Sequence, residues 1–340
     1  MPTDKADAFE SFPSNALNQR MEIPYFLRYL QLFRCIVLAL SGGEYLESYF
    51  CYLNKGSRKK VMHQEEKRLT SGGNFHLNKW FLDFTGENGE AMIFYAAKLT
   101  WHGLTTFYTS WLRYNTASGV RLKSRFRNVQ FPEMRNNLIS WSDSKFGVSG
   151  TWESAAKTIQ TRLLDLEEGY LDWKCYQPAS KVQLRINDRV LEGKGYAEQL
   201  ILTVPPWKIP MDELRWGRFG SDGINLVWIE LQEKEKLQWL WLNGEKIENC
   251  IIEDDHISIP EKDLVLKLDR GVVLESEKKI FSVVENLIRL IPGFNKIIPL
   301  SFLMADEIKW LSKGEFQAQG KTIAGGMAIH ELVNFKASQP

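Results

Sequence analysis

Apolar and polar residues alternate in short segments along most of the chain beyond residue 75. Alternation over four to eight residues is typical of a β-strand with one buried face, and turn residues separate these segments. The Asn243-Gly244 pair, between segments 238–242 and 246–252, is a strong signal for a two-residue hairpin turn. The same pattern predicts further strands at 101–114, 120–130, 163–166, 170–176, 181–186, 298–311 and 325–335.

Two stretches of the chain follow the same order of residue types. Each begins with a tryptophan, Trp80 or Trp216, continues through a phenylalanine and an Asn-Gly or Asp-Gly turn, and ends in an apolar run. The far ends of the two halves also correspond, with Gly-Tyr-Ala-Glu ending at Glu198 and Ala-Ile-His-Glu ending at Glu331. These landmarks are 136 and 133 residues apart, so one period of about 135 residues fits both. A repeat of this size indicates two β domains related by duplication.

A proline-rich segment at 204–210 separates the two halves, because proline lacks an amide donor and rarely enters a central strand. Many short strands with regular turns favour small closed barrels, since closure removes exposed sheet edges. A barrel of about eight strands can hold one small ligand. The predicted organisation is a tail with a helical segment at 1–73, a first β domain at 74–204 and a second at 205–340.

Helical spacing of apolar residues predicts two helices outside the strand pattern, at 24–40 and 279–291. The uninterrupted apolar part of the first, residues 35–40, is too short to span a bilayer. We expect the 24–40 helix to pack against the β domains. A contact with a membrane surface or with a second copy of the chain is the alternative.

The composition narrows the kinds of molecule that the protein is expected to bind. The 43 basic and 42 acidic residues give a formal net charge of +1, so nucleic acid is not an expected partner. The 12 Trp, 19 Phe and 11 Tyr residues suit half-buried sheets and also line apolar ligand pockets. Four scattered cysteines predict neither a metal site nor a disulfide framework. The first twenty residues are polar and unlike a signal peptide, which makes a cytoplasmic location the default expectation.

The order of these features resembles the tandem-lipocalin family of carotenoid 1,2-hydratases (hydroxyneurosporene synthase-like proteins). Related natural-product cyclases, including lipocalin-like Diels–Alder enzymes, share that architecture. The resemblance rests on Trp80 with an acid soon after it, on a closing Gly-x-Gly-Tyr followed by Glu198, and on the proline-rich bridge into Trp216. It covers residues 75–335 and implies an all-β fold of two tandem lipocalin-like (calycin) β-barrels. It also implies a hydrophobic small-molecule substrate and no cofactor.

The chain departs from the hydratases directly after Tyr196. The hydratases have a His-Asp-His-Asn-Trp-Gly run there, in which the second His and the Trp are implicated in water addition. This chain has Gln199 and Ile201 at those two positions and keeps the acid as Glu198. Because protonating an isolated alkene needs a general acid, the resemblance implies the fold but not the hydration reaction.

The candidate catalytic residues are Glu198, Tyr196 and Glu230. The resemblance places Glu198 and Glu230 near the domain junction, where burial beside Trp would raise the pKa of a carboxyl group and let it act as an acid near neutral pH. The alternative is that both carboxylates are structural and bind backbone groups or an arginine. The candidate substrate-binding residues are Trp80, Trp101, Gln199, Trp216 and Trp228, with a core role as the alternative for each ring.

The sequence contains no phosphate-binding glycine loop, nucleophile elbow or metal-ligand spacing. The leading hypothesis is therefore a cofactor-independent cyclase or isomerase of secondary metabolism. It would fold a hydrophobic polyene or polyketide-type substrate inside an aromatic-lined pocket, which lowers the barrier by restricting conformers. A carotenoid or isoprenoid 1,2-hydratase and a non-catalytic lipid or pigment binding protein are the two alternatives.

Overall fold

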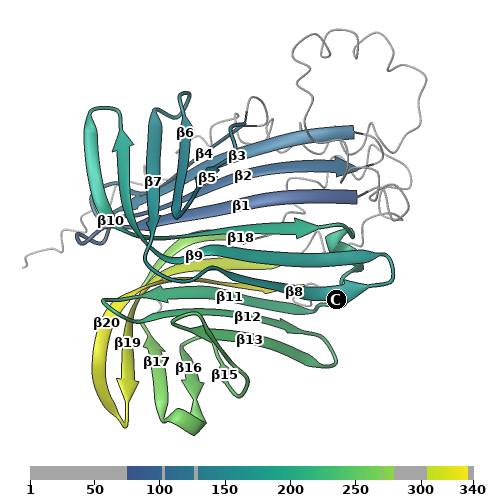
Figure 1. Cartoon of the computed structure of the whole chain (residues 1–340), viewed down its shortest axis with the longest axis vertical. Helices are drawn as coiled ribbons and strands as arrows, with labels where there is room; N and C mark the ends of the chain where they lie inside the picture. The colour runs from purple at the N-terminus through teal and green to yellow at the C-terminus, as the bar shows by residue number, and fades with distance from the viewer. Residues whose placement is uncertain (1–74, 102–103, 126–128, 270, 279–304, 336–340) are drawn as a thin grey trace, which may run out of the picture.

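The computed structural model of the chain describes residues 75–101, 104–125, 129–269, 271–278 and 305–335. Within these residues the chain forms two antiparallel ten-stranded sheets, each strongly curled (Figure 1). The predicted all-β class with two successive β units is confirmed. The predicted helices at 24–40 and 279–291 lie outside the described residues. None of the helices that the structure describes is long and apolar enough to cross a membrane.

The first sheet has the strand order β4-β3-β2-β1-β10-β9-β7-β6-β5, and β8 pairs with β9 beside this path. Its strands are β1 (Phe75–Thr85), β2 (Ala91–Trp101), β3 (Leu104–Asn115), β4 (Gly119–Arg125), β5 (Glu133–Arg135), β6 (Leu138–Asp143), β7 (Val148–Ser154), β8 (Ile159–Leu166), β9 (Gly169–Ile186) and β10 (Arg189–Leu202).

The second sheet repeats this arrangement in the order β14-β13-β12-β11-β20-β19-β17-β16-β15, with β18 beside β19. A short 3-10 helix, η3 (Pro206–Lys208), joins the sheets, and a second, η4 (Pro260–Lys262), precedes β17. The strands are β11 (Glu213–Gly220), β12 (Asn225–Gln232), β13 (Lys236–Leu242), β14 (Glu245–Ile247), β15 (Ile251–Ile252), β16 (His256–Ile259), β17 (Leu264–Leu268), β18 (Val272–Lys278), β19 (Asp306–Ala318) and β20 (Lys321–Asn334).

Most predicted strands are found, with different ends. The hairpin at Asn243-Gly244 is confirmed, and both residues have the positive φ angles, 52° and 81°, of a type I′ turn. The two strands predicted at 170–176 and 181–186 are wrong as separate elements, because β9 runs unbroken through Pro178. The β9–β10 register shifts beside Tyr196, and a bulge of this kind accommodates a residue that cannot donate to the ladder.

The duplicated strands meet across an approximate two-fold relation. Asp83 and Arg218, 135 residues apart, form an ion pair between the sheets. At the same offset, Phe81 corresponds to Trp216, and the two ring centroids lie 4.9 Å apart. Trp80 instead stacks on Tyr176 inside the first sheet. Trp80 and Trp216, which begin the two copies of the repeat in the sequence, are therefore not at equivalent positions in the structure. Their positions differ by one residue, so the two side chains point to opposite faces of their strands.

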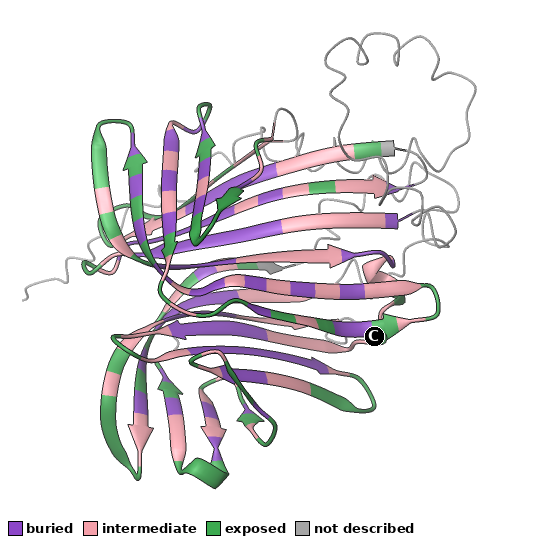
Figure 2. Ribbon diagram, in the orientation of Figure 1, coloured by how far each residue is buried: buried purple, intermediate pink, exposed green. Residues whose placement is uncertain are grey.

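Three apolar clusters hold the molecule together, and Figure 2 shows continuous buried stretches along the central strands β1 and β12, which are covered on both faces. One cluster fills the curl of the first sheet around Trp152, and another fills the second sheet around Phe219. The third lies between the sheets, where β9 contacts β12 and β10 contacts β11. The interior between the two sheets is therefore a core in its own right, and it contains the cavity described next.

Candidate functional site

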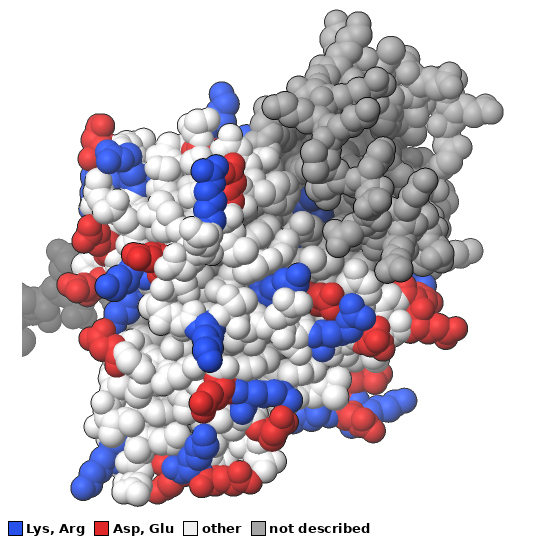
Figure 3. Space-filling view, in the orientation of Figure 1, with Lys and Arg blue, Asp and Glu red and all other residues white. Residues whose placement is uncertain are grey.

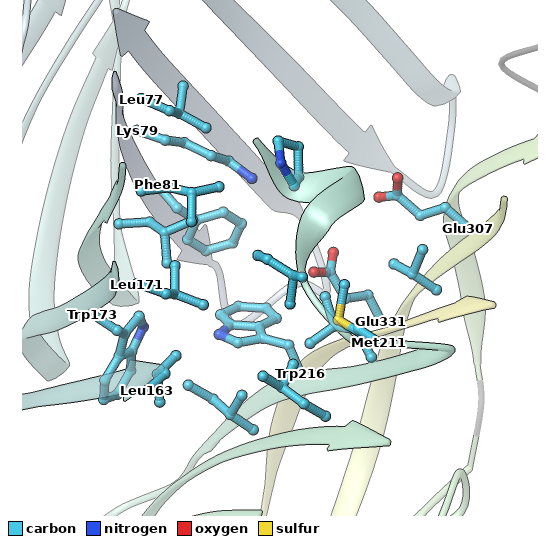
Figure 4. Close-up of a pocket in the computed structure, with 18 of the residues that line it drawn as sticks. Leu77, Lys79, Phe81, Leu163, Leu171, Trp173, Met211, Trp216, Glu307 and Glu331 are labelled. Carbon is cyan, nitrogen blue, oxygen red and sulfur yellow. The ribbon is translucent and has the colours of Figure 1, made fainter. Parts of the chain in front are cut away.

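A cavity of about 320 Å³ lies between the two sheets. It is mostly apolar, as ligand pockets commonly are. Figure 4 shows side chains of both sheets and of the segment that joins them directed into it. The apolar lining consists of Leu77, Phe81, Leu163, Leu171, Trp173, Leu200, Leu202, Pro206, Ile209, Met211, Leu214, Trp216, Ile229, Leu231, Ala305, Val333 and Phe335.

Glu198 is, with Lys79 and Tyr95, one of the polar residues on the first-sheet side of this cavity, and its oxygen Oε2 accepts three hydrogen bonds. The donors are the hydroxyl of Tyr196 at 2.5 Å, the indole Nε1 of Trp173 at 2.5 Å and the indole Nε1 of Trp216 at 3.2 Å. None of the described residues donates to the other oxygen, Oε1. One carboxyl oxygen is thus fully engaged by the protein, and the other is left for a ligand.

Burial among apolar side chains raises the pKa of Glu198 above its ordinary value of 4.5. The hydrogen bonds from Tyr196 and Trp173 and the charge of Lys79 act in the opposite direction, and burial outweighs them. Glu198 therefore takes up a proton more readily than an exposed glutamate does. Since Oε2 already accepts three donors, such a proton belongs on Oε1.

The support behind Glu198 is also buried and neutral. Tyr196 and Cys175 are both fully buried, and the cysteine thiol is hydrogen-bonded to the tyrosine hydroxyl. Burial raises the pKa of both groups well above their ordinary values, so neither provides a charge near neutral pH. Trp173 stacks on Trp241 of the other sheet, with ring centroids 4.8 Å apart. These contacts fix the direction of the donors and hence of the Glu198 carboxyl group.

The second-sheet side of the cavity is charged. Lys309 is almost completely buried, and its Nζ lies 3.1 Å from Glu275, 3.1 Å from Glu307 and 2.8 Å from Glu331. It also donates to the hydroxyl of Tyr95 at 3.0 Å. The surrounding carboxylates raise the pKa of Lys309 well above its usual value, although burial alone would lower it. Three carboxylates share one ammonium group, and two of them, Glu307 and Glu331, line the cavity.

The structure separates the predicted catalytic residues. Glu198 lines the cavity, and Tyr196 binds its carboxyl group from behind. Glu230 is also fully buried, but it does not line this cavity. Its oxygens accept hydrogen bonds from Arg215 at 2.9 Å and from the side-chain amide of Gln238 at 2.5 Å. This is the structural role, binding an arginine, that was the alternative to catalysis for Glu230.

The predicted substrate-binding residues are also dispersed. Only Trp216 lines the cavity. Trp101 packs against Trp207, with ring centroids 5.2 Å apart, and Gln199 binds the hydroxyl of Tyr176 and the amide of Asn78. The remaining two rings belong to the cores of the individual sheets, Trp80 in the first and Trp228 in the second.

Three residues of the site were not predicted as site residues: Trp173, Lys309 and Glu331. For Glu331 the signal was present, because the repeat period aligns it with Glu198. Alternation along β19 places Lys309 on the same face as the exposed residues Lys313 and Glu315, so its burial was not predictable from the strand pattern. Nothing in the local pattern marks Trp173, whose role depends on the approach of the second sheet.

On the face of the molecule drawn in Figure 3, basic and acidic side chains are interspersed and form no large patch of one charge. Among the described residues, no group of three or more His, Cys, Asp or Glu side chains is placed to hold a metal ion. The candidate site is therefore the cavity between the sheets.

No family model matches the chain, and no curated protein sequence matches it. Three solved structures are similar in fold. A protein of Nitrosomonas europaea, provisionally assigned as AttH, is 11% identical, with a TM-score of 0.42, over 82% of this chain and 97% of that chain. CghA in complex with Sch210972 is 10% identical, with a TM-score of 0.41, over 77% and 89%. Kievitone hydratase from Nectria haematococca is 12% identical, with a TM-score of 0.41, over 77% and 89%.

Proposed function

We propose that the chain is an enzyme that acts without a cofactor on a hydrophobic, carbonyl-bearing small molecule bound between the two sheets. The reaction class is cyclisation or isomerisation, with Glu198 as the group that donates a hydrogen bond or a proton to the substrate. A polyene or polyketide-type compound suits the cavity, because most of the wall is aliphatic or aromatic.

One observation carries this proposal: three neutral donors converge on Oε2 of Glu198 at the wall of an apolar cavity. Burial raises the pKa of this carboxyl group against the effect of these donors, and in its protonated form it donates a hydrogen bond to the ligand through Oε1, the oxygen that the three donors leave open. Such a donor stabilises negative charge that develops on a carbonyl oxygen. A carrier needs only the apolar wall, so the engaged carboxyl group favours catalysis over simple binding.

The test uses the full chain and a panel of linear polyenes that bear a ketone or an amide. Binding is followed by quenching of tryptophan fluorescence, because Trp173 and Trp216 line the cavity. Products are followed by mass spectrometry. An isomer of unchanged mass supports cyclisation or isomerisation, a mass gain of one water supports a hydratase, and quenching without any product supports a binding protein.

The variant Glu198→Gln keeps the size of the side chain and removes its acidic proton. We expect it to bind the ligand within a few-fold of the parent and to lose turnover by a factor of about 100 or more, the usual contribution of a positioned acid. The matched control is Glu192→Gln on the same strand, where the side chain is exposed. Full turnover by Glu198→Gln would show that the site has been placed incorrectly.

A further inference from the structure

The proposed function leaves the charged side of the cavity without a role, although Glu331 and Glu307 line it as directly as Glu198 does. The two glutamates at equivalent repeat positions, Glu198 and Glu331, have opposite surroundings. Glu198 is held by one hydroxyl and two indole groups, whereas Glu331 is held by the buried ammonium of Lys309. Glu198 thus has no cation among its hydrogen-bond partners, whereas Glu331 is paired with one. Pairs of this kind identify an acid and a base in one site.

The two carboxyl groups also lie near one another. Trp216 of β11 is the register partner of Glu331 of β20, and the same indole donates to Glu198. Figure 4 shows Trp216 and Glu331 next to each other in the cavity wall, with Glu307 farther out. A substrate that rests on the Trp216 ring would contact both carboxyl groups.

Glu331 remains a competent base in spite of its ion pair. Lys309 is shared among three carboxylates, so it neutralises Glu331 only in part, and Lys79, which also lines the cavity, is a second cation near this group. The pair with Lys309 uses Oε2 of Glu331, and none of the described residues donates to Oε1. Glu307 is the weaker choice, because its side chain is more exposed than that of Glu331, 36% against 18%.

We propose that Glu331 is the proton acceptor of this cavity and Glu198 its proton donor, so that the enzyme moves a double bond of a β,γ-unsaturated carbonyl substrate into conjugation. This inference rests on the proposed function and names its reaction. The substrate class follows from the pair, since a carbonyl oxygen is needed to meet the acid and a C–H bond next to that carbonyl is needed to meet the base.

The proton transfers balance without any further reagent. In the first step the α C–H bond breaks and its proton passes to Glu331, while the proton of Glu198 passes to the carbonyl oxygen and a dienol forms. In the second step Glu331 returns a proton to the γ carbon, and the dienol O–H proton returns to Glu198. The product is a conjugated isomer of unchanged mass, and both carboxyl groups recover their starting states.

The experiment uses a bicyclic β,γ-unsaturated ketone of decalin size, which the cavity can enclose. Binding is measured by tryptophan quenching, and conjugation is measured by the rise in ultraviolet absorbance. We expect isomerisation well above the buffer rate, and we expect Glu331→Gln to lower the rate by a factor of about 100 or more while binding changes only a few-fold. Glu331→Gln should fold, because Lys309 keeps Glu275 and Glu307 as partners. Glu315→Gln, exposed on β19, is the control.

The outcomes separate the two proposals. If the ketone binds but is isomerised no faster than in buffer, or if Glu331→Gln retains the parent rate, the assignment of Glu331 is overturned while the cavity and Glu198 stand. If the ketone does not quench the tryptophans at all, the proposed binding of apolar carbonyl compounds fails, and this inference fails with it.

Discussion

The ion pair between Asp83 and Arg218 offers the sharpest test of how the two sheets are held together. Both side chains are buried, at 0% and 3% exposure, and the guanidinium binds the two carboxylate oxygens at 2.8 and 2.6 Å. The backbone amide of Tyr196 also donates to Asp83. We expect Asp83→Asn and Arg218→Met each to destabilise the protein strongly, and to do so with different pH dependence.

Removing one partner of a buried pair typically costs about 3–5 kcal/mol, because the other charge stays buried without a partner. Asp83→Asn leaves a guanidinium that cannot lose its proton, so this variant cannot recover stability by titration between pH 7 and pH 5. Arg218→Met leaves a carboxyl group that can escape by protonation. Burial raises the pKa of Asp83, and the parent's Arg218 opposes that shift.

The direction of the pH effect follows from this difference. In Arg218→Met the folded state holds a proton on Asp83 that the unfolded chain has released, so the variant recovers stability as the pH falls. Each pH unit is worth up to about 1.4 kcal/mol, so the penalty at pH 5 should be smaller than at pH 7, by at most roughly 3 kcal/mol. The double variant removes both charges and should cost clearly less than the sum of the single variants.

Urea unfolding of the parent, the two single variants and the double variant, at both pH values, measures these quantities. Lys194→Met serves as the control, because the Lys194–Asp222 pair joins the same two sheets at the exposed surface, where solvent screens the two charges, and its loss should have little effect. The reasoning is refuted if the single variants cost less than about 1 kcal/mol. Strict additivity in the double variant would refute it equally.

Two further outcomes are expected for the parent fold. Because the folded pKa of Glu198 is raised, the free energy of unfolding should fall as the pH rises from 4.5 through that pKa, and Glu198→Gln should remove this slope in urea titrations. Gly217→Ala should cost about 1–3 kcal/mol, since an added Cβ would lie 2.2 Å from the Trp228 ring, whereas Gly325→Ala meets open space and should be neutral by thermal unfolding. Equal effects of the two alanines, or an unchanged slope, would contradict these expectations.

The fold was predictable from the sequence because strand alternation and turn residues are local signals. The Asn243-Gly244 turn has the backbone that its residue types require, and the repeat period led to two sheets of the same order. Comparing the two halves by residue type gave the wrong strand register at one point. Aligning Trp80 with Trp216 misplaces the register by one, and in a strand one residue decides which face a side chain occupies.

The site was only partly predictable, because it is formed by contacts between the sheets. Glu198 and Tyr196 adjoin a recognisable Gly-Tyr segment, and both are at the site. Trp173 and Lys309 come from strands more than a hundred residues apart, and each acquires its role only when the other sheet packs against it. Glu230 shows the converse, because a buried acid in the expected part of the chain is used by Arg215 as a structural partner.

A single pair of equivalent positions accounts for the difference between the two halves of the cavity. In the first sheet the register partner of Glu198 is Cys175, and in the second sheet the register partner of Glu331 is Lys309. A thiol offers no counter-charge, so burial outweighs the hydrogen bonds and raises the pKa of Glu198. An ammonium offers one, so Glu331 is ion-paired. The two glutamates lie at equivalent repeat positions in the wall of one cavity, and the residue beside each determines whether a counter-charge is present.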